Sequence, residues 1–160
     1  MKQKALRRNI EIGGFLAIVV SLALLVYETR QNTLAVQASA LQQHFEQHTA
    51  LVSAGLGNEK LREVGTKGQS GLEALDNAEL NLFVPYNWNV MRSNFVAFEL
   101  KRSGMLPESQ WRTFEAALAR RLKRSQGVRE LWSIRKNEFT DEYQALVDGI
   151  IESEEKIHTF

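Results

Sequence analysis

The first pattern along the chain is an uninterrupted apolar run near its N-terminus. Residues 12–27 read IGGFLAIVVSLALLVY and contain nothing more polar than one serine and one tyrosine. A helix of this length spans about 24 Å, a little less than the hydrocarbon core of a bilayer, and it satisfies its own backbone hydrogen bonds in lipid. The run therefore predicts a single transmembrane helix over residues 12–27.

A cleavable signal peptide has the same basic start and apolar run, so it is the main alternative. No small-x-small cleavage site follows Tyr27 directly, because Glu28-Thr29-Arg30 comes next. The segment Ala38-Ser39-Ala40 has the right form, but it lies about a dozen residues too late for normal cleavage. An uncleaved anchor is therefore the favoured interpretation.

The polar pattern beyond the anchor is helical. No proline or glycine occurs between Phe15 and Ala54, so we expect the membrane helix to continue through residues 28–54 as a stalk. Helical spacing places a set of mainly apolar residues on one face of this stalk: Leu34, Ala38, Leu41, Phe45, His48 and Val52. The stalk is expected to end at residues 55–58 and to pack as the first helix of a bundle formed by residues 55–160.

Two helices separated by a loop are expected next. A short helix should cover residues 59–64, and residues 65–71 are the most linker-like stretch. Asp76 and Glu79 have the spacing of a capping box that begins a helix, and Gly104 is a natural residue just beyond its end near Ser103. Pro85 should kink this helix or shift its start. One buried stripe is predicted on it: Leu80, Val84, Trp88, Met91, Phe95 and Phe98.

Three further helices complete the pattern. Pro107 should open the first of them, which is expected to end near Gly127. A short helix begins with Val128, and Thr140 should cap the last one. No segment alternates as a strand does. The predicted fold is all-α, with a single N-terminal transmembrane helix that continues into an antiparallel helical bundle.

The distribution of charge along the sequence predicts how the chain is oriented across the membrane. The chain is formally +1, but four cations lie within the first eight residues (Lys2, Lys4, Arg7 and Arg8), and residues 28–57 contain only Arg30. The positive-inside rule therefore places residues 1–11 in the cytoplasm and the bundle on the far side of the membrane, which is the periplasm if this is an inner-membrane protein of a Gram-negative bacterium. The remainder is slightly acidic, which argues against a nucleic-acid partner.

Small residues recur every four positions along the anchor, at Gly13, Ala17 and Ser21. This spacing lets two helix backbones approach closely, so it suits a neighbouring membrane protein or a homodimer. The alternative is that such residues are simply common in membrane helices. The lipid bilayer itself is the other expected contact of this segment.

Candidate chemistry is sparse. His44 and His48 lie i, i+4 on one helix and are weak metal candidates, because Glu46 points away and no third ligand is near in sequence. The chain has no cysteine, no phosphate-cradling glycine loop and no Gly-x-Ser-x-Gly elbow. We therefore expect no catalytic residue, no cofactor and no enzyme. The three tryptophans each fall on an apolar stripe, which favours core packing over a ligand pocket.

A basic cluster is the other candidate for contact with a partner. It comprises Arg120, Arg121, Lys123 and Arg124. One interpretation is contact with lipid headgroups or with an acidic partner. The alternative is a solvated face whose charges complement the helix dipole.

The order of these landmarks resembles a widespread family of uncharacterised bacterial single-pass membrane proteins. The resemblance rests on residues 30–33 (Arg-Gln-Asn-Thr) after the anchor, the segment 75–79 (Leu-Asp-Asn-Ala-Glu), and the Phe-rich segment 95–98 that leads to Gly104. It continues through Trp111, the Gly-x-x-x-x-Trp element 127–132 and the segment 139–143, where Tyr143 stands in place of the usual phenylalanine. The resemblance implies an anchor and a C-terminal helical domain, and it implies no activity.

Two functions fit these observations. The first is a non-catalytic, membrane-anchored interaction module, most concretely an accessory or structural subunit of a larger bacterial membrane complex. The alternative is a periplasmic ligand-sensing bundle that signals through a partner protein. A small-molecule pocket between the helices that carry Trp88 and Trp111 would favour the alternative. A helical metal protein around the two histidines is a third, weaker hypothesis.

Overall fold

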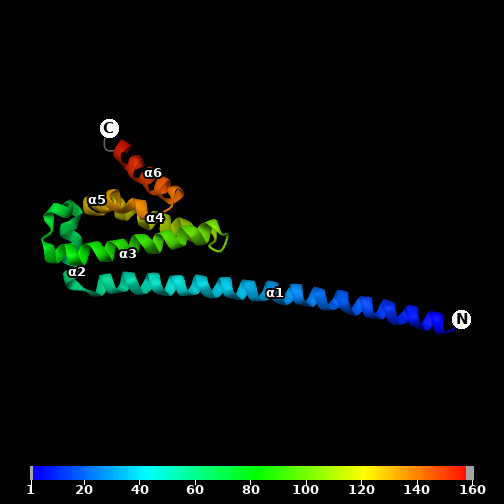
Figure 1. Ribbon diagram of the computed structural model, residues 1–160. Helices are drawn as coiled ribbons and strands as arrows, with labels where there is room; N and C mark the ends of the chain where they lie inside the picture. The colour runs from blue at the N-terminus through cyan, green and yellow to red at the C-terminus, as the bar shows by residue number, and fades with distance from the viewer. Residues whose placement is uncertain (1, 158–160) are drawn as a thin grey trace. The chain divides into compact units, whose positions relative to one another are not determined.

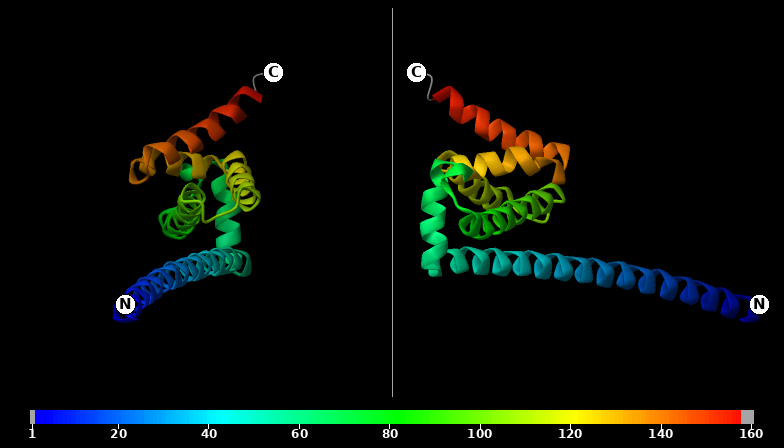
Figure 2. Two further views of the ribbon diagram at one scale, coloured as in Figure 1. Left: turned by 90° about the vertical axis from the view of Figure 1, so that its right-hand side faces the viewer. Right: turned by 60° about the vertical axis from the view of Figure 1, so that its left-hand side comes forward.

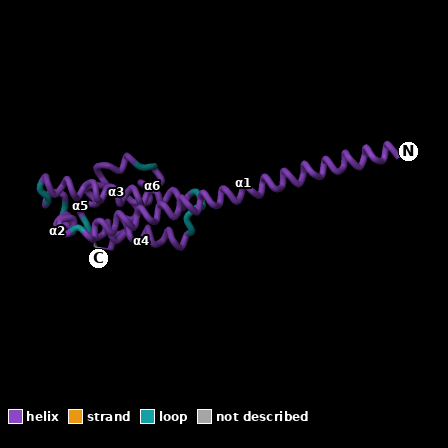
Figure 3. The backbone as a smooth tube through the Cα atoms, turned by 90° about the horizontal axis from the view of Figure 1, so that it is seen from below, coloured by secondary structure: helices purple, strands orange, loops and turns teal. Residues whose placement is uncertain are grey.

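The fold is entirely helical within the part of the chain that the structure describes. The computed structural model describes the backbone of residues 2–157 and the side chains of residues 13–153. No strand occurs in these residues, and every regular element is an α-helix or a short 3-10 helix (Figure 3). The predicted all-α class, with a long N-terminal helix leading into a bundle, is confirmed. The predicted cytoplasmic cluster Lys2 to Arg8 lies outside the described side chains.

The elements follow one another with short connections (Figure 1). The α-helices are α1 (Lys2–Gly57), α2 (Glu59–Lys67), α3 (Asn77–Arg102), α4 (Glu108–Arg124), α5 (Gln126–Arg135) and α6 (Asp141–Ile157). The 3-10 helices are η1 (Gly68–Ser70), η2 (Leu72–Ala74) and η3 (Lys136–Glu138). The chain divides into two compact units, residues 1–40 and residues 41–160.

The first unit is the N-terminal part of α1, drawn in blue in Figure 1. All described side chains of residues 13–36 are exposed. The first unit belongs to the one described helix, Gly13–Gly57, that is long and apolar enough to cross a membrane, judged by length and composition. A signal sequence or the core helix of a soluble protein passes the same test. The apolar residues of the first unit have no protein core within the described unit.

The second unit is a bundle of the last turns of α1 with α2 to α6 (Figure 2). The predicted inward face of the stalk is only partly correct. Leu34 is 52% exposed and Ala38 is also exposed, so neither contributes to the bundle. Leu41 and Phe45 pack against a buried cluster, and His44 is buried too. The bundle therefore begins near Leu41, inside the predicted stalk.

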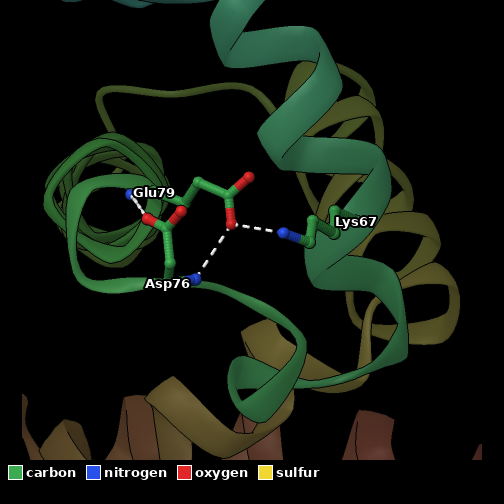
Figure 4. A network of polar contacts seen from close by, with 3 residues as sticks. All are labelled: Lys67, Asp76 and Glu79. Atoms are coloured by element: carbon green, nitrogen blue, oxygen red, sulfur yellow. Dashed lines mark hydrogen bonds and ion pairs between the residues drawn. The ribbon is translucent and has the colours of Figure 1, made fainter.

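The predicted capping box begins α3. Asp76 Oδ1 accepts a hydrogen bond from the Glu79 N–H at 2.8 Å, and Glu79 Oε2 accepts one from the Asp76 N–H at 2.9 Å. Lys67 Nζ lies 2.6 Å from the same Glu79 oxygen, so the end of α2 is tied to the start of α3 (Figure 4). The hydrogen bond from Lys67 and the backbone bond from Asp76 lower the pKa of Glu79.

The C-terminus of α3 is closed by a Schellman motif. Met105 N–H donates to the Leu100 carbonyl at 2.9 Å, and Gly104 N–H donates to the Lys101 carbonyl at 3.0 Å. Gly104 has φ 76°, a conformation that glycine adopts without a side-chain clash. Its predicted role is confirmed. Pro85 lies inside α3, so it does not shift the helix start, and the alternative prediction of a kink stays a prediction.

The core is built around α3, which contacts α2, α4 and α5. Helices α3 and α4 are joined by a tight turn and run in opposite directions (Figure 1). Trp88 and Met91 of the predicted stripe are buried as expected, but more of α3 is buried than this stripe predicts. Four further apolar residues of α3 are buried as well: Phe83, Val90, Ala97 and Leu100. A helix covered on several sides cannot be recognised from one stripe.

The core consists of two clusters, and the three tryptophans belong to them. The larger cluster includes Trp88, Met91, Trp132 and Tyr143, while the smaller one contains Trp111. The indole of Trp132 stacks on Phe139 with ring centroids 5.4 Å apart. Its Nε1 donates to Asp148 Oδ1 at 2.8 Å. The predicted core positions of all three indoles are confirmed.

The linker expected at residues 65–71 is not a linker. Helix α2 continues to Lys67, and η1 follows immediately. Gly68 and Gly127 are both buried, and a Cβ built on Gly127 would lie 2.6 Å from the Gly68 carbonyl oxygen. The glycines thus permit a close backbone approach between η1 and α5, which are far apart in sequence.

The boundaries of the last three helices differ from prediction in detail. Helix α4 ends at Arg124, so Gly127 lies inside α5 and does not terminate α4. Ser125 caps α5, because its Oγ accepts a hydrogen bond from the Val128 N–H. Thr140 does precede α6, but its Oγ1 has no hydrogen-bond partner within the described part of the chain. The predicted side-chain cap at Thr140 is therefore wrong.

Candidate functional site

A pocket of about 520 Å³ lies in the bundle, where α2, α3 and α4 meet the last turn of α1 and the start of α5. Residues on α2 and α4 form its charged sides, while Phe83, Tyr86 and Asn87 of α3 contribute an aromatic and amide wall. Leu56, which is 66% exposed, lies on its border. This volume falls in the range of small-molecule sites.

Four arginines line this pocket: Arg62 from α2, and Arg120, Arg121 and Arg124 from α4. Among the described residues, no aspartate, glutamate or histidine lines the pocket. Within the described part of the chain, none of these arginines forms an ion pair. We refer to this site as the basic pocket. A group of like charges without counter-charges is the electrostatic arrangement of an anion site.

Arg121 is held in place by its neighbours. Its Nη1 donates to Asn87 Oδ1 at 2.6 Å, and its guanidinium carbon lies 5.6 Å from the centre of the Tyr86 ring. Asn87 is itself buried and donates through Nδ2 to the Phe83 carbonyl at 2.9 Å. Both partners of Arg121 are neutral, so its positive charge is oriented and is not cancelled.

The helix dipole explains only part of this cluster. Arg121, Lys123 and Arg124 all lie in the last turn of α4, where cations are favourable. The carbonyls of Leu122 and Lys123 at this helix end, however, already accept hydrogen bonds from Arg129 Nη1. The dipole also gives no reason for Arg62 of α2 to face the same pocket.

The predicted basic cluster is thus divided by the structure. Arg120, Arg121 and Arg124 line the pocket, and Lys123 does not. Arg62 and Tyr86 are additional members that sequence reasoning missed. They are distant in sequence from residue 120 and carry no motif, so no local signal identifies them.

The two histidines form an aromatic cluster. The rings of His44 and His48 are 6.3 Å apart, and they lie 5.7 and 5.0 Å from the ring of Phe114. His48 Nδ1 is 2.9 Å from Ser93 Oγ, while the buried His44 Nε2 has no hydrogen-bond partner among the described residues. Burial lowers the pKa of both rings. The charge of His48 adds to this effect at His44, and the charge of Arg121 adds to it at His48.

No third metal ligand joins the histidines among the described side chains. The described residues contain no group of three or more histidine, cysteine, aspartate or glutamate side chains suited to a metal ion. Glu46 is turned to Gln42, whose Nε2 donates to Glu46 Oε1 at 2.9 Å. The pair therefore offers two ligands on one helix, which is short of the three or four that a stable zinc site uses.

The predicted helix-packing residues of the anchor lie in the first unit. Gly13, Ala17 and Ser21 are all exposed, and no atom lies within 4 Å of a Cβ built on Gly13. The described chain thus leaves this face open to another helix. Its use as an interface stays a prediction.

Comparison of the chain with protein-family models, curated proteins and solved structures finds no match. The resemblance to the family of bacterial single-pass proteins therefore stays a prediction.

Proposed function

We propose that this chain is a single-pass, membrane-anchored helical module that acts by binding protein, most concretely as an accessory subunit of a larger bacterial membrane complex. One observation carries the proposal. A single helix, α1, contains both a fully exposed apolar segment and a segment built into the core of the bundle. An anchor and a folded extramembrane domain thus share one element.

The exposed apolar segment needs an apolar environment. Its large side chains between Phe15 and Tyr27 are 45% to 67% exposed. Burying each of them is worth about 1.5–3 kcal/mol, so leaving the whole run in water is strongly unfavourable. A bilayer, with a neighbouring helix against the Gly13, Ala17 and Ser21 face, supplies that environment. The basic start then favours a cytoplasmic N-terminus and a periplasmic bundle.

The basic pocket supports binding over catalysis. Its lining offers guanidinium groups, amides and hydroxyls, and among the described residues it contains no carboxylate, histidine or cysteine. Such groups hold a charged ligand or partner in place, whereas proton transfer needs a base with a pKa near neutrality. The lining of the pocket therefore supports a binding role for the proposed module.

The test is a mild-detergent purification of the full chain from native membranes, with identification of every co-purifying protein. The variant Ala17→Leu/Ser21→Leu adds bulk to the small-residue face, and Val19→Leu/Val26→Leu adds bulk to the opposite face as the matched control. A stoichiometric partner that the first variant loses and the control retains is the expected result. Recovery of the chain alone in every preparation would overturn the accessory-subunit proposal.

A ligand-sensing bundle is the second candidate, and the basic pocket is the observation that favours it. The pocket lies between the helices that carry Trp88 and Trp111, although neither indole lines it, since both are buried in the core clusters. A sensor would change the protection of α1 residues 41–57 when the pocket is filled. Hydrogen exchange of the full chain in nanodiscs, with and without a bound ligand, measures that change; unchanged protection would count against sensing.

A further inference from the structure

We propose that the basic pocket is a binding site for an organic phosphate, with the phosphate on the arginines and an apolar or aromatic group against Tyr86 and Leu56. The proposal goes beyond the accessory-subunit function and stands whether or not a protein partner exists. It rests on the charge, positioning and shape of the pocket.

Charge identifies the ligand as a multiply charged anion. Guanidinium groups from two different helices, Arg62 on α2 and three arginines on α4, border one cavity that no carboxylate of the described part of the chain lines. Arginine is always protonated, so these groups repel one another in the empty pocket and gain from a shared anion. A single carboxylate balances one of them, whereas a phosphate ester carries close to two negative charges near neutral pH.

The fixed position of Arg121 favours a specifically bound phosphate over loosely associated counter-ions. Arg121 is fixed between Asn87 and the Tyr86 ring, so part of the entropy cost of ordering a flexible arginine is met before a ligand arrives. The planar guanidinium fork donates two parallel hydrogen bonds to phosphate oxygens. Gln69 and Thr66 also line the pocket, and the Gln69 amide can donate to further oxygens.

The size and the lining of the pocket indicate that the ligand also contains an organic group. A cavity of about 520 Å³ is larger than a bare phosphate requires. Its remaining border includes the exposed Leu56 and the aromatic ring of Tyr86. A ligand that covers this border with an apolar group gains burial that inorganic phosphate cannot provide. The phosphate can come from a soluble ester or from a lipid headgroup, which share the same chemistry.

The experiment titrates the full-length chain in phosphatidylcholine nanodiscs with phenyl phosphate and with inorganic phosphate, by isothermal titration calorimetry. A second arm measures the unfolding midpoint of the bundle when part of the phosphatidylcholine is replaced by phosphatidic acid. The pocket variant is Arg62→Gln/Arg124→Gln, whose side chains are exposed and have no ion pair in the described residues. The control is Arg92→Gln/Arg112→Gln, which removes the same charge from outside the pocket.

The expected result is saturable one-to-one binding of phenyl phosphate that is tighter than binding of inorganic phosphate. The pocket variant should weaken it by about tenfold or more, because two charge-assisted hydrogen-bond donors are lost, and the control should leave it nearly unchanged. Stabilisation by phosphatidic acid alone, lost only in the pocket variant, would identify a lipid headgroup as the source. Absence of binding in both arms, or equal losses in variant and control, would overturn the proposal. Neither outcome depends on whether a partner protein co-purifies.

Discussion

The two parts of α1 place apolar side chains in opposite surroundings. In residues 13–36 every side chain is exposed, including Phe15 and Val26 at 67%. Seventeen residues at the other end, Leu41–Gly57, have a clear inner face on which His44 is buried and Phe45 packs on Phe114 at 5.7 Å between ring centroids. The same helix therefore has two different environments along its length, and the difference lies in its side chains.

The difference lies in how the apolar residues are distributed around the helix. Residues 13–27 carry almost only apolar side chains around the whole helix, so no single protein face can cover them. The second part has one inner face, which packs against both α3 and α4: His48 Nδ1 lies 2.9 Å from Ser93 Oγ of α3, and Phe45 packs on Phe114 of α4. If this comparison is correct, the bundle and the anchor should respond independently to substitutions.

The largest effect is expected from the core of the bundle. Trp132→Ala removes an indole that is 1% exposed and that bonds Asp148, so we expect the free energy of unfolding to fall by about 3–5 kcal/mol. Ile134→Ala is the control, because Ile134 lies on the same helix and is 68% exposed. Urea unfolding of the full chain in detergent, followed by near-UV circular dichroism, measures both. Equal losses in the two variants would contradict the assigned core.

A charge in the apolar run should act on the membrane alone. Leu22→Arg places a cation near the centre of residues 12–27, and insertion should become less favourable by about 2.5–3.5 kcal/mol. The matched Leu34→Arg variant lies on the same helix outside the run. The fraction of protein that resists alkaline extraction from membranes is the measurement, and the unfolding midpoint of the bundle should not change. Retention of Leu22→Arg at the wild-type level would argue against an anchor.

A smaller effect is expected where η1 meets α5. Gly127→Ala would place a methyl group 2.6 Å from the Gly68 carbonyl oxygen, and the required backbone shift should cost about 1–3 kcal/mol. Gly149→Ala is the control, since nothing lies within 4 Å of a Cβ built there. That change should stabilise α6 by about 0.5–1 kcal/mol. Urea midpoints of the two variants should therefore move in opposite directions; a shift in the same direction would contradict the close approach.

The smallest effect is a dependence of stability on pH. Burial lowers the pKa of His44 and of His48 in the folded bundle below the ordinary value of 6.5. Below that value the unfolded chain binds protons that the folded chain does not, so stability falls as the pH drops from about 7 to about 5. The variant His44→Gln/His48→Gln should flatten this fall in thermal midpoints. An unchanged slope would assign the pH dependence to other groups.

Local features of the sequence predicted most of the fold, because their causes are local. The Asp76–Glu79 capping box and the αL position of Gly104 depend on residues within one turn. The buried apolar residues of α4 and α6 also lie at helical spacing, namely Trp111, Phe114, Leu118 and Leu122 on α4, and Tyr143 and Val147 on α6. These are the elements whose identity and approximate ends the amino-acid pattern determines.

Features that depend on tertiary neighbours could not be predicted. The stretch 65–71 contains glycines typical of a linker, yet Gly68 is buried because Phe83 and Gly127 approach it. Three of the four arginines that line the basic pocket could be predicted as a cluster, because they lie close together in the sequence of one helix. The position of Arg62 opposite them depends on how α2 crosses α3, and a helical period contains no information about that crossing.

The contact between η1 and α5 also sets an order for biosynthesis. Ser125 Oγ donates to the Gly68 carbonyl at 3.1 Å, across 57 residues of chain, while the Leu72 N–H donates to Glu130 Oε2 at 2.7 Å. In a nascent chain that ends before α5, these backbone groups lack their hydrogen-bond partners and the ring of Phe83 lacks its packing contact with α5. Helices α2, α3 and α4 therefore emerge from the ribosome before these hydrogen bonds can form. The packing around η1 is complete only when residues 125–130 have been synthesised.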